Sequence, residues 1–233
     1  AIDPERVFIA GYSRGGHAAW GVSLREPDPF AGVIALAGGL RLTWGQDQNN
    51  FRFLENLAAM PLFALIGRQD DPMLVWNVEE AGRRLAAWGA PLVLEIRADA
   101  GHLLAPAPGA IGAWLEKLRR PAAPARVVLL GTAPCSRAWA GIVRLEAGYQ
   151  RPFKPAFQAA QWNAWDKDTQ RRKIADAAIA ATARLELRIA GPGRIEGEAR
   201  GVRQLALRAG PDQPLADAKR SEEHTSELQS PNT

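Results

Sequence analysis

Hydrophobic and polar positions follow two different patterns along the chain, and the change falls near residue 120. Before that point, short apolar runs alternate with longer segments whose apolar residues recur at helical spacing. This alternation is typical of βαβ units and predicts a mainly parallel sheet with helices on both faces. The four strands are predicted from the apolar runs 7–10, 32–37, 61–66 and 91–96.

Two helices can be placed around these strands. Asn77 and Glu80 have the spacing of a capping box, which predicts a helix that begins at Asn77. The same pattern continues to Trp88, and Gly89 is a natural C-terminal glycine. A later helix carries one apolar stripe that can pack on the sheet. This stripe consists of Ile111, Trp114, Leu115 and Leu118.

Beyond a proline-punctuated linker at 121–125, the apolar period changes to two. Residues 185–189 and 195–199 alternate apolar and polar side chains around a glycine-rich turn. This pattern predicts a small antiparallel β-module with one buried and one solvated face. Further strands are predicted at 127–130, 139–145 and 202–209. The alanine-rich stretch 157–182 is interpreted as helix or as a long surface excursion.

Composition limits the partners of the chain. It is 47 % hydrophobic over 233 residues with a net charge of +4, as expected of a globular protein. Its densest basic run, at 171–173, lacks a nucleic-acid motif and is interpreted as a solvated face, so no nucleic-acid partner is predicted. The apolar runs are too short to predict a membrane span. A single cysteine, Cys135, predicts neither a disulfide framework nor a cysteine-based metal site, and the compartment stays open.

The two ends of the chain are interpreted separately. Residues 220–233 contain RSEEHTSELQS, which resembles the in-frame translation of a sequencing adapter, and we treat them as an artefactual tail. A genuine polar tail is the alternative. At the other end, the chain has no initiator Met and enters the first predicted strand within a few residues. We therefore expect a gene fragment that is cut at both ends.

The most informative stretch is GYSRG at 11–15, a G-x-S-x-G motif at the end of the first predicted strand. Such a tight strand-to-helix turn holds Ser13 at a strained backbone position and lifts its hydroxyl above the sheet edge. Gly11 and Gly15 are predicted to remove side chains that would collide with the neighbouring strand and helix. The turn also directs the Arg14 backbone N–H, at a helix N-terminus, toward a developing oxyanion.

A serine hydroxyl needs a base within hydrogen-bond reach. His17 lies one turn after Ser13 on the predicted helix, so its side chain is interpreted as a packing or surface group. His102 follows the fourth predicted strand, at the sheet edge where α/β proteins expose functional groups. His102 is therefore the predicted base.

Two adjacent carboxylates follow the third predicted strand, and either could orient the base. Asp71 is held extended because it precedes Pro72, and Asp70 is the preferred acid. Asp71 remains the alternative, and loop capping is the alternative role for Asp70. The order Ser13, Asp70, His102 is the order of catalytic residues in α/β-hydrolases.

The segments DPERVFIAGYSRGGHAAW, LFALIGRQDDP and ADAGHLL resemble the nucleophile, acid and histidine segments of the α/β-hydrolase superfamily. Bacterial carboxylesterases of the phospholipase/carboxylesterase, feruloyl-esterase and polyhydroxybutyrate-depolymerase-like groups are the most similar. The resemblance covers residues 1–120 and implies the C-terminal half of the fold, truncated at its N-terminus. Residues 126–219 more weakly resemble a β-module that some bacterial esterases carry, here truncated as well.

The resemblance implies a function and a mechanism. Ser13 would be the nucleophile, His102 the base and Asp70 the acid of an acyl-enzyme mechanism on a small-molecule or polymer ester. It implies no cofactor and no metal. Because the missing half would include early strands and a second oxyanion donor, the chain as written is expected to be inactive. Export, to the periplasm or the medium, is favoured by the resemblance alone.

Several alternatives stay open at this stage. A serine peptidase of the prolyl-oligopeptidase type shares the fold and the residue order, and a non-catalytic binding module is the candidate from another class. The second module could also be a structural cover for the first. Trp44 could line an acyl or aryl pocket, or pack in the core or against a lid. Trp162 and Trp165 are interpreted as core residues or as a carbohydrate platform. Substrate identity and oligomeric state are left open.

Overall fold

A computed structural model describes residues 2–42, 49–120, 124–149 and 155–208. Its first part is a four-stranded sheet in the order β1-β2-β3-β4, with every neighbouring pair parallel. The strands are β1 Phe8–Tyr12, β2 Gly32–Leu36, β3 Leu62–Gly67 and β4 Leu92–Arg97. They match the four predicted strands, with ends that differ by at most two residues.

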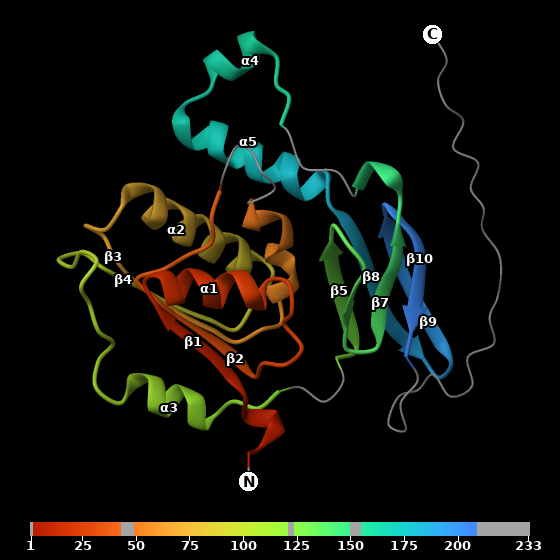
Figure 1. The fold of residues 1–233 in the computed structure, drawn as a ribbon, viewed down its shortest axis with the longest axis horizontal. Helices are drawn as coiled ribbons and strands as arrows, with labels where there is room; N and C mark the ends of the chain where they lie inside the picture. Colours follow the sequence, from red (N-terminus) through yellow and green to blue (C-terminus); the bar gives the residue numbers. More distant parts are fainter. Residues whose placement is uncertain (1, 43–48, 121–123, 150–154, 209–233) are drawn as a thin grey trace.

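Helices cover both faces of the parallel sheet (Figure 1). On one face, α1 (Arg14–Ser23), α2 (Pro72–Ala87) and the 3-10 helix η2 (Asn50–Leu57) bury alternate residues of β2 and β3. On the other face, α3 (Ala110–Glu116) packs three residues of the predicted stripe, Ile111, Trp114 and Leu115, against the remaining residues of these strands, and Leu118 lies beyond the helix. Because both faces are covered, β2 and β3 are continuous apolar runs. A short 3-10 helix, η1 (Pro4–Arg6), precedes β1.

The predicted start of α2 is wrong. The helix begins at Pro72, and the Asp71 side chain caps it by accepting hydrogen bonds from the backbone N–H groups of Met73 and Leu74. Proline at the first helical position is already set for the helix, so the Asp-Pro pair outweighs the capping-box pattern. Asn77 lies inside the helix, buried, and donates to the Leu40 carbonyl oxygen. The predicted end is correct, because Trp88 is the C-cap and Gly89 follows with φ +74°.

The second part contains two antiparallel sheets of three strands each. One has the order β5-β8-β9, formed by Arg126–Gly131, Ala183–Gly191 and Arg194–Arg200. The other has the order β10-β7-β6, formed by Val202–Leu207, Ala140–Leu145 and Cys135–Arg137. The hairpin predicted around the glycine-rich turn is the β8–β9 pair. Strand β6 was not predicted.

The stretch left open between helix and surface excursion contains two helices. They are α4 (Ala159–Ala164) and α5 (Lys167–Ala180), and Asp166 caps α5 by accepting from the Thr169 N–H. A single 3-10 turn, η3 (Ala147–Tyr149), follows β7. In the part of the chain that the structure describes, no helix has both the length and the apolar character to cross a membrane.

One apolar core extends from the first part into the second. Strand β5 is buried on both faces: Val127 and Leu129 join the apolar cluster that the two antiparallel sheets share, whereas Val128 and Leu130 join the cluster around η2. Residues of α5 belong to the same cluster. The Asn56 side chain of η2 donates to the Leu130 carbonyl at 3.0 Å and accepts from its N–H at 2.7 Å. Helix η2 is therefore packed by both parts at once.

Candidate active site

Ser13 occupies the sharp turn between β1 and α1. Its backbone has φ 56° and ψ −116°, a region that non-glycine residues rarely adopt. Two hydrogen bonds hold this conformation. The Ser13 N–H donates to the Leu36 carbonyl oxygen at 2.8 Å, and the Ser13 carbonyl oxygen accepts from the His17 N–H at 3.0 Å. The end of β2 and the first turn of α1 therefore keep the serine in place.

Glycines allow the backbone to pass closely around this turn. A Cβ on Gly11 would lie 2.1 Å from the Gly15 carbonyl carbon, and one on Gly38 would lie 2.6 Å from the Ser13 carbonyl oxygen. The role predicted for Gly15 is wrong, because a Cβ there would have nothing within 4 Å among the described residues. Gly16 is the crowded position instead, with the Leu36 carbonyl oxygen 2.8 Å from its Cβ position.

Three side chains from three strand ends meet at the carboxyl edge of the parallel sheet. Ser13 follows β1, Asp70 follows β3 and His102 follows β4. The Ser13 Oγ lies 2.8 Å from His102 Nε2, and His102 Nδ1 lies 2.9 Å from Asp70 Oδ2. The Asp70 side chain is 8 % exposed, whereas the His102 side chain is 46 % exposed. The ring is thus held from its buried side and open toward solvent.

The partners of His102 determine where its proton lies. An ionised carboxylate can only accept hydrogen bonds, so Asp70 favours the tautomer that carries the proton on Nδ1. The Nε2 lone pair is then free to accept the Ser13 hydroxyl proton. The second carboxylate oxygen of Asp70, Oδ1, accepts from the Asp71 N–H at 2.7 Å. This arrangement can transfer a proton from Ser13 to His102.

The two adjacent aspartates have different surroundings. Asp70 contacts the imidazole, whereas the Asp71 carboxylate accepts from the Met73 and Leu74 N–H groups at 2.9 and 3.0 Å. The alternative in which Asp71 orients the base therefore has no contact to His102 in its favour among the described residues.

The loop that carries His102 is held by residues that the sequence analysis did not single out. A Cβ on Gly67, at the end of β3, would lie 2.2 Å from the Ala100 carbonyl oxygen, so only glycine lets the loop approach. The Tyr12 hydroxyl donates to the His102 carbonyl oxygen at 2.6 Å. The only sequence signal for this contact is the position of Tyr12 inside the G-x-S-x-G motif.

The remaining predicted site residues lie as follows. Arg14 is the first residue of α1, where an α-helix offers no acceptor for the backbone N–H, and its side chain is exposed. Nδ1 of the half-buried His17 lies 3.2 Å from the Gly39 nitrogen and 2.5 Å from its carbonyl oxygen, which fits a packing role. Trp44 lies outside the described residues. The described residues contain no cluster of three or more His, Cys, Asp or Glu that could hold a metal.

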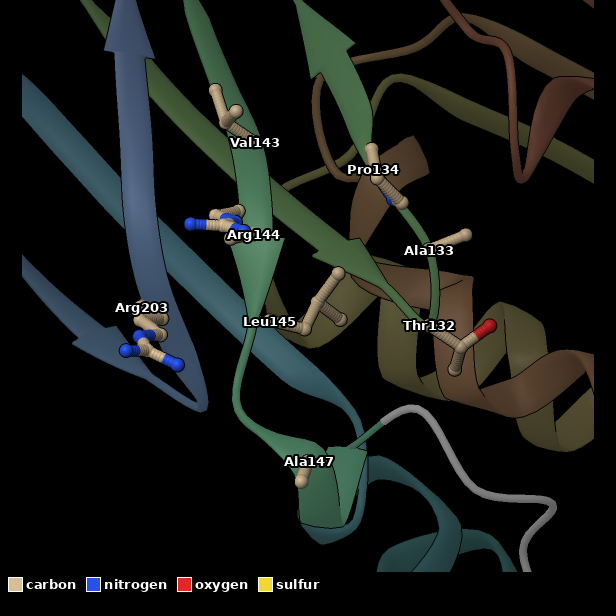
Figure 2. A pocket seen from close by; sticks show the side chains of 8 residues that line it. All are labelled: Thr132, Ala133, Pro134, Val143, Arg144, Leu145, Ala147 and Arg203. Atoms are coloured by element: carbon tan, nitrogen blue, oxygen red, sulfur yellow. The ribbon is translucent and has the colours of Figure 1, made fainter.

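A surface pocket lies away from Ser13, Asp70 and His102. It has a volume of about 660 Å³ and is lined by residues of the β5–β6 loop, β7, β10 and the turn after β7 (Figure 2). Two arginines, Arg144 and Arg203, are among the residues that line it. It contains no serine, histidine or carboxylate, so its size does not make it a site for the chemistry available at Ser13.

Solved structures of esterases are similar to part of this chain. Esterase PE8 is 23% identical, with a TM-score of 0.36, and the match covers 49% of this chain and 50% of that one. A variant of SOBER1 from Arabidopsis thaliana is 21% identical over 50% of this chain and 55% of its own, with a TM-score of 0.40. A thermostable esterase is 23% identical over 51% of this chain and 32% of its own, with a TM-score of 0.42.

The match thus spans about half the length of the first two proteins. No protein-family model matches the chain, and the search of curated proteins finds no match.

Proposed function

We propose that this chain carries the catalytic groups of a serine hydrolase that cleaves carboxylic esters through an acyl-enzyme on Ser13. The observation that carries the proposal is the hydrogen-bonded series from Ser13 through His102 to Asp70, with distances of 2.8 and 2.9 Å. A strained serine whose hydroxyl faces a base, itself oriented by an acid, is the arrangement that nucleophilic catalysis needs. A binding protein has no need of all three groups in contact.

In the proposed first step, Ser13 Oγ forms a bond to the ester carbonyl carbon while His102 Nε2 takes the hydroxyl proton. Asp70 keeps the ring in the reactive tautomer and stabilises the imidazolium that forms. His102 then gives the proton to the alcohol oxygen as the ester C–O bond breaks. In the second step, water attacks the acyl carbon with His102 again as the base. The carboxylic acid product leaves, and His102 returns the proton to the Ser13 Oγ.

We propose the Arg14 backbone N–H as one donor to the developing oxyanion. It stands at the N-terminus of α1, where backbone N–H groups and the helix dipole favour negative charge. The guanidinium group is not required for this role. A place for Trp44 in an acyl or aryl pocket remains part of the proposal.

The test is covalent labelling with a fluorophosphonate probe. We expect one label per chain, on Ser13, and none on Ser13→Ala. Ser136→Ala is the matched control, because it removes a hydroxyl from β6 and should leave labelling unchanged. Labelling needs only a single attack by Ser13 and does not depend on turnover. Intact mass and circular dichroism would show the adduct and the fold.

Absence of the label from a folded wild-type chain would contradict the proposal and favour the binding module. If labelling succeeds, paired ester and amide substrates with the same acyl group separate the esterase from the peptidase. Expulsion of an amine requires protonation of its nitrogen, so we expect cleavage of the ester to be faster. Equal or faster cleavage of the amide would favour a serine peptidase over an esterase.

A further inference from the structure

Tyr12 connects the strand that presents the nucleophile to the loop that presents the base. It is the last residue of β1 and directly precedes Ser13. Its hydroxyl donates to the His102 carbonyl oxygen at 2.6 Å, and the two rings lie 5.8 Å apart at an angle of 59°. In the described part of the chain, this is the only hydrogen bond to the backbone of His102.

This contact joins residues that follow the two outer strands of the parallel sheet, β1 and β4. β2 and β3 lie between β1 and β4, so neighbouring spacings of about 4.8 Å separate the two strands by roughly 14 Å. Ser13 and His102 therefore meet only because the loop after β4 reaches back across the sheet edge. The hydrogen bonds between the strands of the sheet do not hold this loop in place at His102.

Other contacts hold the loop on both sides of the histidine. The Gln69 N–H donates to the Ala100 carbonyl oxygen at 2.9 Å, and Arg97 donates to the Ala105 carbonyl oxygen at 2.6 Å. Both bonds come from β3 and β4 or the residues that follow them, on the His102 side of the sheet. Tyr12 supplies the bond from the Ser13 side.

We propose that Tyr12 is a positioning residue for the base: through its hydroxyl it fixes the distance between Ser13 Oγ and His102 Nε2. This inference rests on the proposed function. The phenol transfers no proton in the reaction, because its single donor is engaged by a backbone carbonyl. Since Tyr12 is 40 % exposed beside the site, the competing role is direct contact with the substrate.

The decisive variant is Tyr12→Phe, which keeps the ring and removes one oxygen. The chain offers a matched control, because its only other tyrosine, Tyr149, lies in the second part. For Tyr12→Phe we expect the maximal rate constant of fluorophosphonate labelling to fall about three- to tenfold, the size of one net hydrogen bond. The probe concentration at half-maximal rate should not change. Tyr149→Phe should match the wild type in both.

Two results of this comparison would overturn the proposal. One is a folded Tyr12→Phe chain that reacts as fast as the wild type. The other is a change in half-saturation with an unchanged maximal rate, which would show that Tyr12 binds the reagent instead.

A second variant tests whether the lost hydrogen bond is the cause. Tyr12→4-aminophenylalanine keeps the ring and places an N–H donor where the hydroxyl was, so we expect it to label at nearly the wild-type rate. A rate as low as that of Tyr12→Phe would overturn the assignment. This variant also decides the question if Tyr12→Phe fails to fold.

A spectroscopic signal separates failure of this inference from failure of the proposed function. The Nδ1 proton of His102, bonded to Asp70, should give a downfield proton resonance that is absent from His102→Ala. We expect this resonance to broaden in Tyr12→Phe, because the ring then samples other positions, and to stay sharp in Tyr149→Phe. An unchanged resonance in Tyr12→Phe would overturn the positioning role even if Ser13 proves unreactive. Absence of labelling in the wild type would refute the proposed function alone.

Discussion

The parallel sheet and the antiparallel sheets distribute their polar side chains in opposite ways. Strands β1, β2 and β3 contain no charged residue. The hydrogen-bonded side chains of Ser13, His102 and Asp70 lie just beyond the ends of strands. The antiparallel strands instead carry charges along their length, paired across the ladder. Arg126–Glu186 and Arg188–Glu196 join neighbouring strands, and Arg184–Glu186 is a further pair within β8.

The difference follows from which surfaces each sheet exposes. A parallel sheet covered by helices on both faces has no wet face, so polar groups are confined to its edges. The carboxyl ends of all its strands point the same way, and their polar groups can therefore converge. In the antiparallel sheets one face stays wet except where η2 covers β5, and charges spread over it pair locally. The location of a polar side chain is thus more informative about function than its presence.

The largest effect is expected from substitution of one of two neighbouring carboxylates, Asp70 and Asp71. Asp70→Asn should lower the labelling rate of Ser13 about a thousand- to ten-thousandfold, because the amide favours the wrong tautomer of His102. Asp71→Asn should leave the rate nearly unchanged, since asparagine is also a good N-cap and α2 keeps its start. The pseudo-first-order rate with a fluorophosphonate measures both. Similar losses in the two variants would contradict distinct roles for the two carboxylates.

The second prediction compares the nucleophiles of the two regions. Burial, with a smaller contribution from the charge of Glu26, raises the pKa of the Cys135 thiol from 9.0 to about 11. The reactive thiolate should therefore be about a hundredfold scarcer at pH 8 in the folded chain than in the unfolded chain. In the proposed mechanism Ser13 attacks the substrate, whereas the raised pKa of Cys135 in β6 keeps its thiol in the unreactive neutral form.

The rate of modification by a chromogenic disulfide, followed from pH 7 to 11 with and without denaturant, measures this difference. Because the folded pKa lies above the unfolded one, the neutral thiol stabilises the fold below about pH 9. That contribution is lost as the pH rises from about 9 to about 11. A folded thiol that reacts at pH 8 as fast as the unfolded one would contradict the assignment. Cys135 is the only cysteine, so the signal has one source.

The fold could be predicted from the sequence where the apolar period is strong. The four parallel strands and the β8–β9 hairpin follow directly from runs and alternation. Strand β6 has three residues, too few to show a period, and α5 is alanine-rich with a weak apolar stripe. The start of α2 was misplaced because two capping signals compete, and the one with proline at the first helical position prevailed. The division into segments 1–120 and 126–219 stays a prediction.

The candidate site could be predicted only for residues that directly follow a predicted strand, because the strand places them at the edge of the sheet. Ser13, Asp70 and His102 each follow a recognisable strand, and the carboxyl ends of parallel strands share one edge. The bond from Tyr12 to His102 depends on how far a loop reaches across two strands, which no spacing encodes. Likewise, the crowding at Gly16 rather than Gly15 depends on the path of the chain after β2.

The smallest expected effect concerns the ion pair that joins the two regions. Arg184 of β8 donates to both carboxylate oxygens of Glu55 in η2, at 2.9 and 2.7 Å, with side chains only 20% and 13% exposed. Arg184→Met should lower the free energy of unfolding by about 1–3 kcal/mol, because it leaves a largely buried carboxylate without its partner.

Arg188→Met is the matched control on the same strand. Its partner is Glu196 within the ladder, and its side chain is 64% exposed, so we expect a loss of about 0–1 kcal/mol. Urea unfolding followed by circular dichroism measures both variants. A larger loss in Arg184→Met would show that ion pairs matter most where they join the regions. Equal losses would mean that the shared apolar core around η2, not this ion pair, couples the parallel and antiparallel sheets.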